Sequence, residues 1–464
     1  MNKHFSIYTL MLLLPTSALL AGCGSVKSLR SDYRRPALAD SDVIRKELPA
    51  SQEAAADDSL PHWREFFTDS ELQCLIAEGL SSNADLQVAR LKVEEAQATL
   101  SASRKASLPT VSMSGSATAN KDKHTSQQTY SVGPEVSWEA DIFARLSNAA
   151  KAAAASVEEQ QAYAQAVQTQ LVATIARDYY QLLAYDTQVD VTRKTIKSWE
   201  EYIRTQRALM KAGQADMADI NQAEASRLSA ETTLQTLLRQ TTELENSLAT
   251  LVGRQASAIC RSSLDSQQLP TEFSRGVSVV RLASRPDVRR QEAMLKQAFY
   301  NVNKARAAFY PKLTLSGSAG WTNSTLTGIS NPGSWLLSAA ANLVQPILNN
   351  GQNTANLKIA QAQQQEALVN WKQSILDAGR EVNNALADGQ SALKTIDLEQ
   401  QQISRLEKTL SDTEAKMRYG STNYLQVVIA RQSLLSAQLS LVTARYNSLE
   451  STVNLYEALG GGNK

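Results

Sequence analysis

One stretch of the sequence occurs twice, and this repetition limits the possible folds more than any other feature. Residues 108–117 read LPTVSMSGSA, and residues 310–319 read YPKLTLSGSA, each after a long charged, Ala-rich run. Pro109 and Pro311 are 202 residues apart, and the gap-free match extends back to Asp85. An internal repeat of this size indicates one architectural unit that is built twice within the chain.

Long helices are expected on both sides of each doubled stretch. The sequence contains neither Gly nor Pro from Arg145 to Ala212, and a helix of that length would span about 100 Å at ~1.5 Å per residue. In the helix that follows, apolar side chains recur at every seventh position: Ala223, Ala230, Leu237, Leu244 and Leu251. A sustained seven-residue period predicts coiled-coil packing against neighbouring helices.

The doubled stretches themselves have the period of strands. Val111 and Met113 alternate with Thr110 and Ser112, and a second alternating run follows a polar loop. Strict alternation of apolar and polar residues on both sides of such a loop is typical of a β-hairpin. We therefore predict hairpins over residues 108–140 and 311–345.

The expected organisation combines these elements into a mainly α chain with a small β part. Helices are expected at about 70–106, 145–212, 217–252, 276–308, 353–418 and 425–459. The predicted segments are a signal peptide (1–22), an N-terminal tether and belt (23–69), a first repeat (70–253), an equatorial linker (254–275), a second repeat (276–460) and a C-terminal tail (461–464).

The start of the chain has the pattern of a bacterial lipoprotein signal. Lys3 provides a positive region, residues 8–20 form a short apolar region, and LAGC ends at Cys23. The sequence predicts that Cys23 is lipidated and becomes the mature N-terminus, and Gly24 favours passage to the outer membrane by resemblance to such lipoproteins. An ordinary signal peptide with an incidental cysteine is the alternative.

Composition and motifs argue against several classes of function. The formal net charge is +1, and acidic and basic residues are interleaved, so a nucleic-acid partner is not expected. The three histidines lie far apart, and no arrangement typical of hydrolases, metal sites or phosphate-binding loops is present. We expect neither an enzyme, nor a cofactor, nor a metal.

If the predicted strands cross a membrane, one chain is not enough. Four strands cannot close a barrel, and an open sheet edge facing lipid would leave backbone groups unpaired. Three copies would supply about twelve strands, within the range of outer-membrane barrels. Trp138, Trp321 and Trp335 lie at the ends of the predicted strands, where interfacial aromatic girdles occur. The alternative is that these side chains pack under the loops of a soluble sheet.

The sequence resembles the outer-membrane factor family, the TolC-like exit ducts of tripartite efflux pumps, and in particular its lipoprotein branch. The motifs that carry the resemblance are LAGC (20–23), DYRRP (32–36), WREFFTDSEL (63–72), NADLQVA (83–89), WEADIFARL (138–146), RPDV (285–288), FYPKLTLSG (309–317), YLQVV (424–428) and LYEALGGG (455–462). The resemblance implies a homotrimer, in which a twelve-stranded barrel in the outer membrane continues as a helical tunnel through the periplasm. A periplasmic adaptor protein and an inner-membrane pump are the implied partners.

The resemblance also places the functional tip of the tunnel at the helix turns 210–219 and 417–426. The candidate residues for the gate and the adaptor contact are Gly213, Asp216, Asp219, Arg418, Tyr419, Gly420 and Tyr424. The two carboxylates could form charged rings around a threefold axis, or they could stabilise the start of the next helix. For Asp216 we favour helix capping, and for Asp219 both roles stay open.

Two further alternatives follow from the sequence. Cys74 and Cys260 fall at helix ends near the expected belt, and in the oxidising periplasm they would be either a disulfide or two free thiols. The chain as a whole would be an exit duct for drugs or other small solutes, a duct for protein secretion, or a structural tether between outer membrane and cell wall. The paired strands favour a duct, because a tether needs none.

Overall fold

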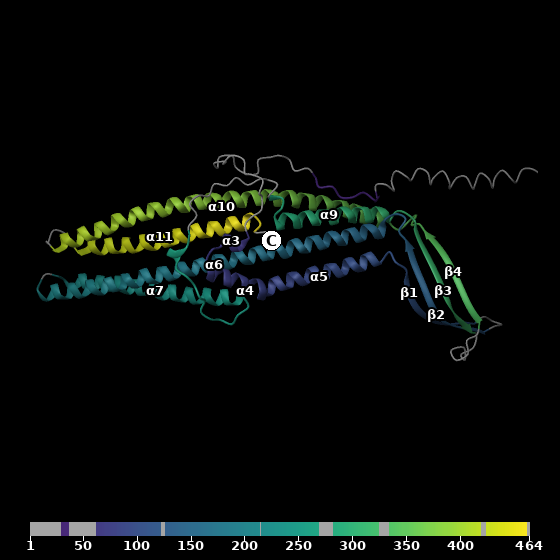
Figure 1. Cartoon of the computed structure of the whole chain (residues 1–464), viewed down its shortest axis with the longest axis horizontal. Helices are drawn as coiled ribbons and strands as arrows, with labels where there is room; N and C mark the ends of the chain where they lie inside the picture. The colour runs from purple at the N-terminus through teal and green to yellow at the C-terminus, as the bar shows by residue number, and fades with distance from the viewer. Residues whose placement is uncertain are drawn as a thin grey trace, which may run out of the picture. The chain divides into compact units, whose positions relative to one another are not determined.

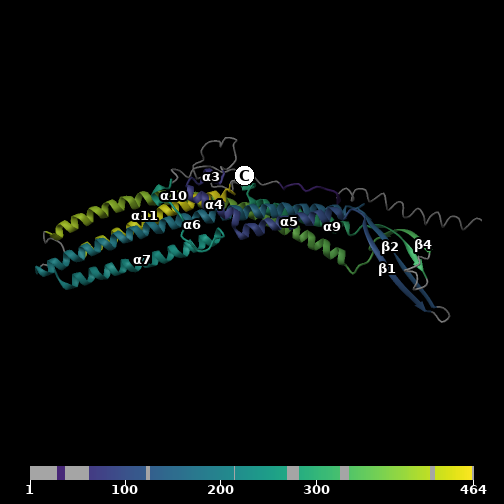
Figure 2. The ribbon, with the colours of Figure 1, turned by 60° about the horizontal axis from the view of Figure 1, so that its bottom comes forward.

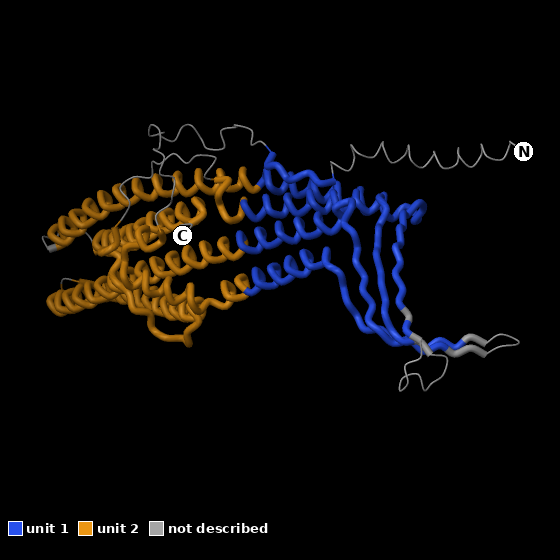
Figure 3. Tube along the Cα trace, turned by 45° about the vertical axis from the view of Figure 1, so that its right-hand side comes forward, with its two compact units in different colours: residues 1–39, 91–162, 289–373 blue, residues 40–90, 163–288, 374–464 orange. Residues whose placement is uncertain are grey.

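The computed structural model describes residues 29–36, 62–121, 126–213, 215–268, 282–323, 334–418 and 424–461. The chain forms two compact units (Figure 3). Unit 1 comprises residues 1–39, 91–162 and 289–373, and unit 2 comprises residues 40–90, 163–288 and 374–464.

Helices dominate the described residues (Figure 1). They are α3 (Trp63–Phe66), α4 (Ser70–Ser82), α5 (Ala84–Lys105), α6 (Arg145–Lys211), α7 (Met217–Leu251), a 3-10 turn (Leu264–Ser266), α9 (Pro286–Ala307), α10 (Gln352–Arg418) and α11 (Tyr424–Ala458). The predicted long helices are confirmed: α6 and α10 each contain 67 residues, and α7 and α11 each contain 35. Within unit 2, α6 lies beside α7 and α10 beside α11 (Figures 1 and 2).

The prediction of one continuous helix over residues 70–106 is wrong. Asn83 has extended backbone angles and separates α4 from α5. Its side-chain oxygen accepts a hydrogen bond from the Leu86 N–H at 2.9 Å, and its amide donates to the Leu251 carbonyl at 2.9 Å. The buried Asn83 side chain therefore caps α5 and binds the end of α7, which stabilises the break.

The helix expected over residues 276–308 is also interrupted. Among the described residues, a helical residue at Leu282 is followed by a turn, and α9 begins only at Pro286. Proline favours the first position of a helix and disfavours the α conformation in the residue before it. The RPDV motif is therefore a helix start and not a helix interior.

Unit 1 contains one antiparallel sheet in the order β1 (Thr110–Lys121), β2 (Ser126–Ala140), β3 (Lys312–Asn323) and β4 (Ser334–Val344). Both predicted hairpins are confirmed. The structure adds the pairing of β2 with β3, which joins the two hairpins into one sheet.

A close approach of two glycines explains an irregularity between β2 and β3. The ladder pairs Val132 with Trp321 and Glu135 with Ser318 but is interrupted between them. A Cβ atom on Gly133 would lie 2.1 Å from the Ala319 carbonyl oxygen, and one on Gly320 would lie 2.5 Å from the Val132 oxygen. Only glycine permits two backbones to approach this closely.

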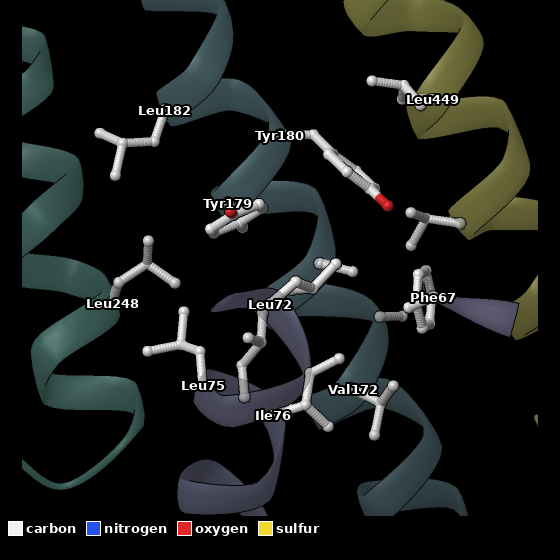
Figure 4. Close-up of a cluster of buried hydrophobic side chains, with 14 of the residues drawn as sticks. Phe67, Leu72, Leu75, Ile76, Val172, Tyr179, Tyr180, Leu182, Leu248 and Leu449 are labelled. Atoms are coloured by element: carbon white, nitrogen blue, oxygen red, sulfur yellow. The ribbon is translucent and has the colours of Figure 1, made fainter. Parts of the chain in front are cut away.

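The largest core described lies in unit 2, where α4 and the segment before it pack on α6, α7 and α11 (Figure 4). Leu72, Ile76 and Tyr179 are fully buried there. Beside this core the Asp69 carboxylate accepts hydrogen bonds from the Tyr179 hydroxyl at 3.0 Å and from the Gln267 amide at 2.7 Å, and also from the Ser262 hydroxyl. This cluster attaches the segment after α7 to the N-terminus of α4 and to α6.

The glycines that follow α11 are required by the fold. Gly460 and Gly461 have positive φ angles of 89° and 66°. The Arg285 guanidinium donates to the carbonyl of Ala458 at 2.7 Å, and the Thr169 hydroxyl donates to the carbonyl of Gly460 at 3.3 Å. Gly460 and Gly461 therefore end α11 in the left-handed backbone conformation, and side chains from α6 and from the residue just before α9 bind this end.

Candidate functional site

The turn between α6 and α7 in unit 2 holds the first group of predicted tip residues. Gly213 has a φ angle of 74°, and its N–H donates to the carbonyl of Met210 at 2.9 Å. Among the described residues, and apart from its own chain neighbours, no atom lies within 4 Å of where its Cβ would be. This exposed left-handed turn ends α6, which is the usual role of a glycine just past a helix.

Of the two carboxylates after the turn, Asp216 differs from our expectation and Asp219 lies where one of its two expected roles places it. Asp216 occupies the N-cap position of α7, but its side chain makes no capping hydrogen bond, so the favoured capping role is not supported. Asp219 lies half-buried in the first turn of α7. Its negative charge, together with the larger effect of burial, raises the pKa of Tyr424.

In unit 2 an aromatic cluster packs the ends of α6, α7, α10 and α11. Its buried members are Trp199, Tyr202, Ile203, Ile220, Ala223, Val427 and Val428. The rings of Tyr202 and Tyr424 stack with centroids 6.2 Å apart and an interplanar angle of 19°. Tyr424, a predicted tip residue, therefore belongs to the packed interior of this end.

Arg431 on α11 is a residue of this region that sequence reasoning missed. Its guanidinium lies 4.9 Å from the Tyr202 ring centroid and 5.6 Å from that of Trp199. It donates to Glu414 on α10 at 2.5 Å and to the Ser198 carbonyl on α6 at 3.2 Å. With the side chain only 14% exposed, a single buried cation connects three helices. We call Arg431 and its four contacts, Ser198, Trp199, Tyr202 and Glu414, the Arg431 clamp.

Several predicted residues cannot be placed. Cys23, Tyr419 and Gly420 lie outside the described residues, and Arg418 is described only as the last residue of α10.

The disulfide alternative is not realised in the structure: Cys74 and Cys260 are free and exposed. Cys74 lies on α4 and Cys260 on the extended segment after α7, and no bond joins their sulfur atoms.

Two searches of the described part of the chain bear on function. No group of three or more His, Cys, Asp or Glu residues is placed to hold a metal ion there. One helix, Tyr424–Ala458, is long and apolar enough to cross a membrane by length and composition alone. Because α11 contributes to both the core and the aromatic cluster of unit 2, this test is weak evidence for a spanning helix.

Comparison with known proteins identifies the family. A family profile described as "Outer membrane efflux protein" matches residues 75–254 and 278–461. The cation efflux system protein CusC of Escherichia coli K12 is 31% identical over 97% of this chain and 99% of its own length. The probable efflux pump outer membrane protein TtgC of Pseudomonas putida KT2440 is 31% identical over 98% of this chain and 96% of its own.

Solved structures agree with the sequence comparison. The open state of the MtrE outer membrane channel of Neisseria gonorrhoeae superposes with a TM-score of 0.83 and 28% identity, covering 94% of this chain and 98% of that one. The mainly helical fold is thus that of the outer-membrane efflux channels. The chain belongs to the outer membrane efflux protein family and is the outer-membrane exit duct of an efflux system.

Proposed function

We propose that three copies of the chain complete a twelve-stranded barrel in the outer membrane, which continues as a helical tunnel into the periplasm. The observation that carries this proposal is the sheet of unit 1, whose strands β1 and β4 are its two edges within the chain. In a bilayer such edges must be paired, and identical sheets from two further copies can pair both of them.

The two faces of the sheet differ in the way a membrane barrel requires. Cross-strand partners lie on the same face, and the face with Val111 and Met113 also carries Val136, Leu315 and Leu337. Val111, Met113 and Leu337 are 71%, 75% and 84% exposed. An apolar face this exposed suits contact with lipid.

The opposite face is lined by hydroxyl groups. Ser116 and Ser131 are hydrogen-bonded at 2.8 Å, and Ser318 and Ser338 at 2.6 Å. These cross-strand pairs alternate with the apolar positions, which gives the sheet one polar face along its length. A polar interior is the arrangement expected of a water-filled duct.

The tryptophans lie near both ends of the sheet. Trp321 pairs in register with Trp335, and their ring centroids are 4.7 Å apart. Trp138 pairs with Leu315, six residues before Trp321 on β3, which corresponds to about 20 Å along a strand. That separation approaches the ~25 Å apolar band that aromatic girdles flank, so we assign these residues to two girdles.

We further propose that the two halves of the chain are structural repeats that form the tunnel wall. In both halves a 22-residue, a 67-residue and a 35-residue helix occur in the same order. The seventh-position residues of the second copy are all buried: Ala430, Ala437, Ala444, Ser451 and Ala458. Small side chains at this spacing permit close helix packing.

We assign a lipid anchor to Cys23 from its sequence motif and from the segment that follows it. Leu29 is buried, and its carbonyl accepts a hydrogen bond from the Asn148 amide at 2.8 Å. Asp32 binds Lys151 at 2.6 Å, which fixes the same segment on α6. Six residues span at most about 20 Å, so lipid on Cys23 would lie within that distance of the start of α6.

The end of unit 2 that carries the Arg431 clamp is our candidate for the gate and the adaptor contact. The adaptor protein and the inner-membrane pump are partners of the proposed system, and drugs or other small solutes are its cargo. The proposed duct itself needs no bound cofactor, resident metal or nucleic-acid partner. CusC is named as a cation efflux system protein, so cations are one cargo to test. A duct for secreted protein is the second candidate, and a structural tether is disfavoured by the exposed apolar sheet.

Purified full-length protein in planar bilayers tests the proposal. We expect trimers by native mass spectrometry and discrete conductance steps in the bilayer. The steps should become more frequent when the clamp is broken by Arg431→Gln. A stable trimer that never conducts, with and without this change, would contradict the duct. Mass analysis tests the anchor: the natural chain should begin at a lipid-bearing Cys23, whereas Cys23→Ser should carry no lipid.

A further inference from the structure

Cys74 and Cys260 are two thiols that the duct function does not use. Both side chains are exposed, and both belong to unit 2. Cys74 lies on α4, and Cys260 lies on the extended segment after α7. Two contacts of this segment with α4 fix how the segment runs, and they determine where the two thiols lie relative to each other.

The first contact lies toward the C-terminal end of α4. The Arg254 guanidinium, just after α7, donates two hydrogen bonds to the Glu78 carboxylate. Glu78 follows Cys74 by four residues, so these two side chains are neighbours on one face of α4. Arg254 therefore holds the start of the segment one helical turn from Cys74.

The second contact lies at the N-terminus of α4, where the Ser262 hydroxyl donates to the Asp69 carboxylate. The segment after α7 thus runs antiparallel to α4. Cys74 lies five residues after Asp69, about 7.5 Å along the helix axis. Cys260 lies two residues before Ser262, at most about 7 Å away. Both cysteines therefore lie beside the same stretch of α4, between the two contacts.

The neighbouring side chains show which way Cys260 points. Alternate side chains of an extended chain lie on opposite sides. On one side, Ile259 is buried in the core and Arg261 donates to carboxylates of α6 and α7. Cys260 lies on the other side, together with Ser262, which binds the start of α4. The Cys260 thiol is therefore directed toward α4.

The electrostatics of Arg254 agree with this placement. The hydrogen bond to Glu78 raises the pKa of Arg254, and burial lowers it. The negative charges of Glu78 and of ionised Cys74 and Cys260 also raise this pKa. Between exposed groups in salt solution such effects extend only about 10 Å. Both thiols therefore lie near the same guanidinium.

We propose that Cys74 and Cys260 are a disulfide pair, which the structure shows in its reduced form and which closes in the periplasm. Each thiol loses one proton and one electron as the sulfur–sulfur bond forms, and the two electrons and two protons reduce the disulfide of a periplasmic thiol oxidase to two thiols. Because both thiols are exposed, such an oxidant can reach them.

The closed bond would tie α4 covalently to the segment after α7. The loop between the two cysteines contains α5, β1, β2, α6 and α7, and closing a loop this long stabilises the fold mainly by restricting the unfolded chain. The proposal goes beyond the duct function, but it rests on the proposed placement of unit 2 in the periplasm, which is an oxidising compartment.

Peptide mapping of the natural chain from its own cells tests the pair. The cells are quenched in acid, and free thiols are blocked with N-ethylmaleimide before digestion. Trypsin then yields peptides 65–90 and 255–261, each of which contains one of the two cysteines. We expect one linked species that carries no maleimide and separates on reduction. In Cys74→Ser and in Cys260→Ser, the remaining cysteine should instead carry one maleimide.

Thermal unfolding supplies a second measurement. Reductant should lower the midpoint of the natural chain by about 5 °C, to the midpoint of Cys74→Ser, and it should leave Cys74→Ser itself unchanged. Serine at this exposed position of α4 changes the packing little, so the variant should form the same trimer as the natural chain.

Three outcomes would overturn the pair. Maleimide on both peptides of the natural chain would show two free thiols. A covalent dimer on a non-reducing gel would show a bond between two copies of the chain. A small thiol attached to either peptide would show a mixed disulfide. Conductance of the same samples separates the two proposals: a chain that conducts with free thiols refutes only the pair, and a bridged chain that never conducts refutes only the duct.

Discussion

Replacing Arg431 by glutamine should loosen the end of unit 2 where four helices meet. The guanidinium donates to Glu414 and to Ser198 and lies over two aromatic rings. A hydrogen bond to a charged group contributes about 1.5 to 3 kcal/mol, and a partly desolvated cation–π contact about 1 kcal/mol. Because Glu414 is 31% exposed and water can replace its partner, we expect a net loss of about 2 to 3 kcal/mol.

A local loss of this size raises the population of the opened end roughly 30- to 150-fold. Hydrogen exchange of the intact trimer measures it directly: amides of α11 near Val427 and of α6 near Tyr202 should exchange faster by that factor, while the core around Tyr179 should not change. Single-channel recording should show more frequent opening of the same variant.

A matched change elsewhere controls for the loss of a positive charge. Arg239 on α7 pairs with Glu243 one turn away, and both side chains are about 60% exposed. Arg239→Gln should therefore alter exchange less than about twofold. If Arg431→Gln and Arg239→Gln give the same exchange profile, the clamp does not hold this end and the reasoning is refuted.

Three other expectations concern stability. Gly461→Ala places a Cβ 2.7 Å from the Thr169 hydroxyl at a positive φ and should lower the free energy of unfolding by about 3 kcal/mol. Gly213→Ala has open space around the new Cβ and should lower it by only about 1 kcal/mol. Equal midpoints of thermal unfolding for the two variants would contradict this. Leu72→Ala empties a fully buried site and should cost about 2 to 5 kcal/mol in denaturant unfolding, so a loss under 1 kcal/mol would count against the packing. Burial raises the pKa of Asp69, but the hydrogen bonds that its carboxylate accepts outweigh burial and lower the pKa overall. The ionised carboxylate therefore stabilises the fold fully above about pH 4, and this stabilisation is lost as the pH falls further. If Asp69→Asn loses thermal stability in acid just as the natural chain does, Asp69 does not have this role.

Several elements could be predicted because their signals are local. The absence of Gly and Pro over residues 145–212 corresponds to α6, and the alternation after Pro109 and Pro311 corresponds to β1 and β3. On α7 the seven-residue period identified the inward-facing line: Ala223, Ala230 and Leu237 are buried, and Leu244 and Leu251 pack against the core. Each of these patterns depends only on the repeat distance of a helix or a strand.

Elements that depend on remote partners were missed or were wrong. Asn83 interrupts a sequence that is otherwise helical because its amide binds Leu251, 168 residues away. Arg431 resembles any other helical surface arginine in the sequence, yet it contacts Ser198, 233 residues earlier. Neither contact has a local signal, because side-chain partners are selected by packing and not by spacing along the chain.

The sequence by itself determined the lengths of the four longest helices, the two hairpins and the family, since periodicity, Gly and Pro positions and joint motif order are properties of the linear chain. Only the tertiary structure decided that β2 pairs with β3, that the largely buried Arg431 joins three helices at one end of unit 2, and that Cys74 and Cys260 lie near one arginine. Those features arise where segments far apart in the chain meet, and their stability comes from desolvation and hydrogen bonding between them. The two SGSA stretches lie in β1 and β3, which are two of the four strands in a single sheet.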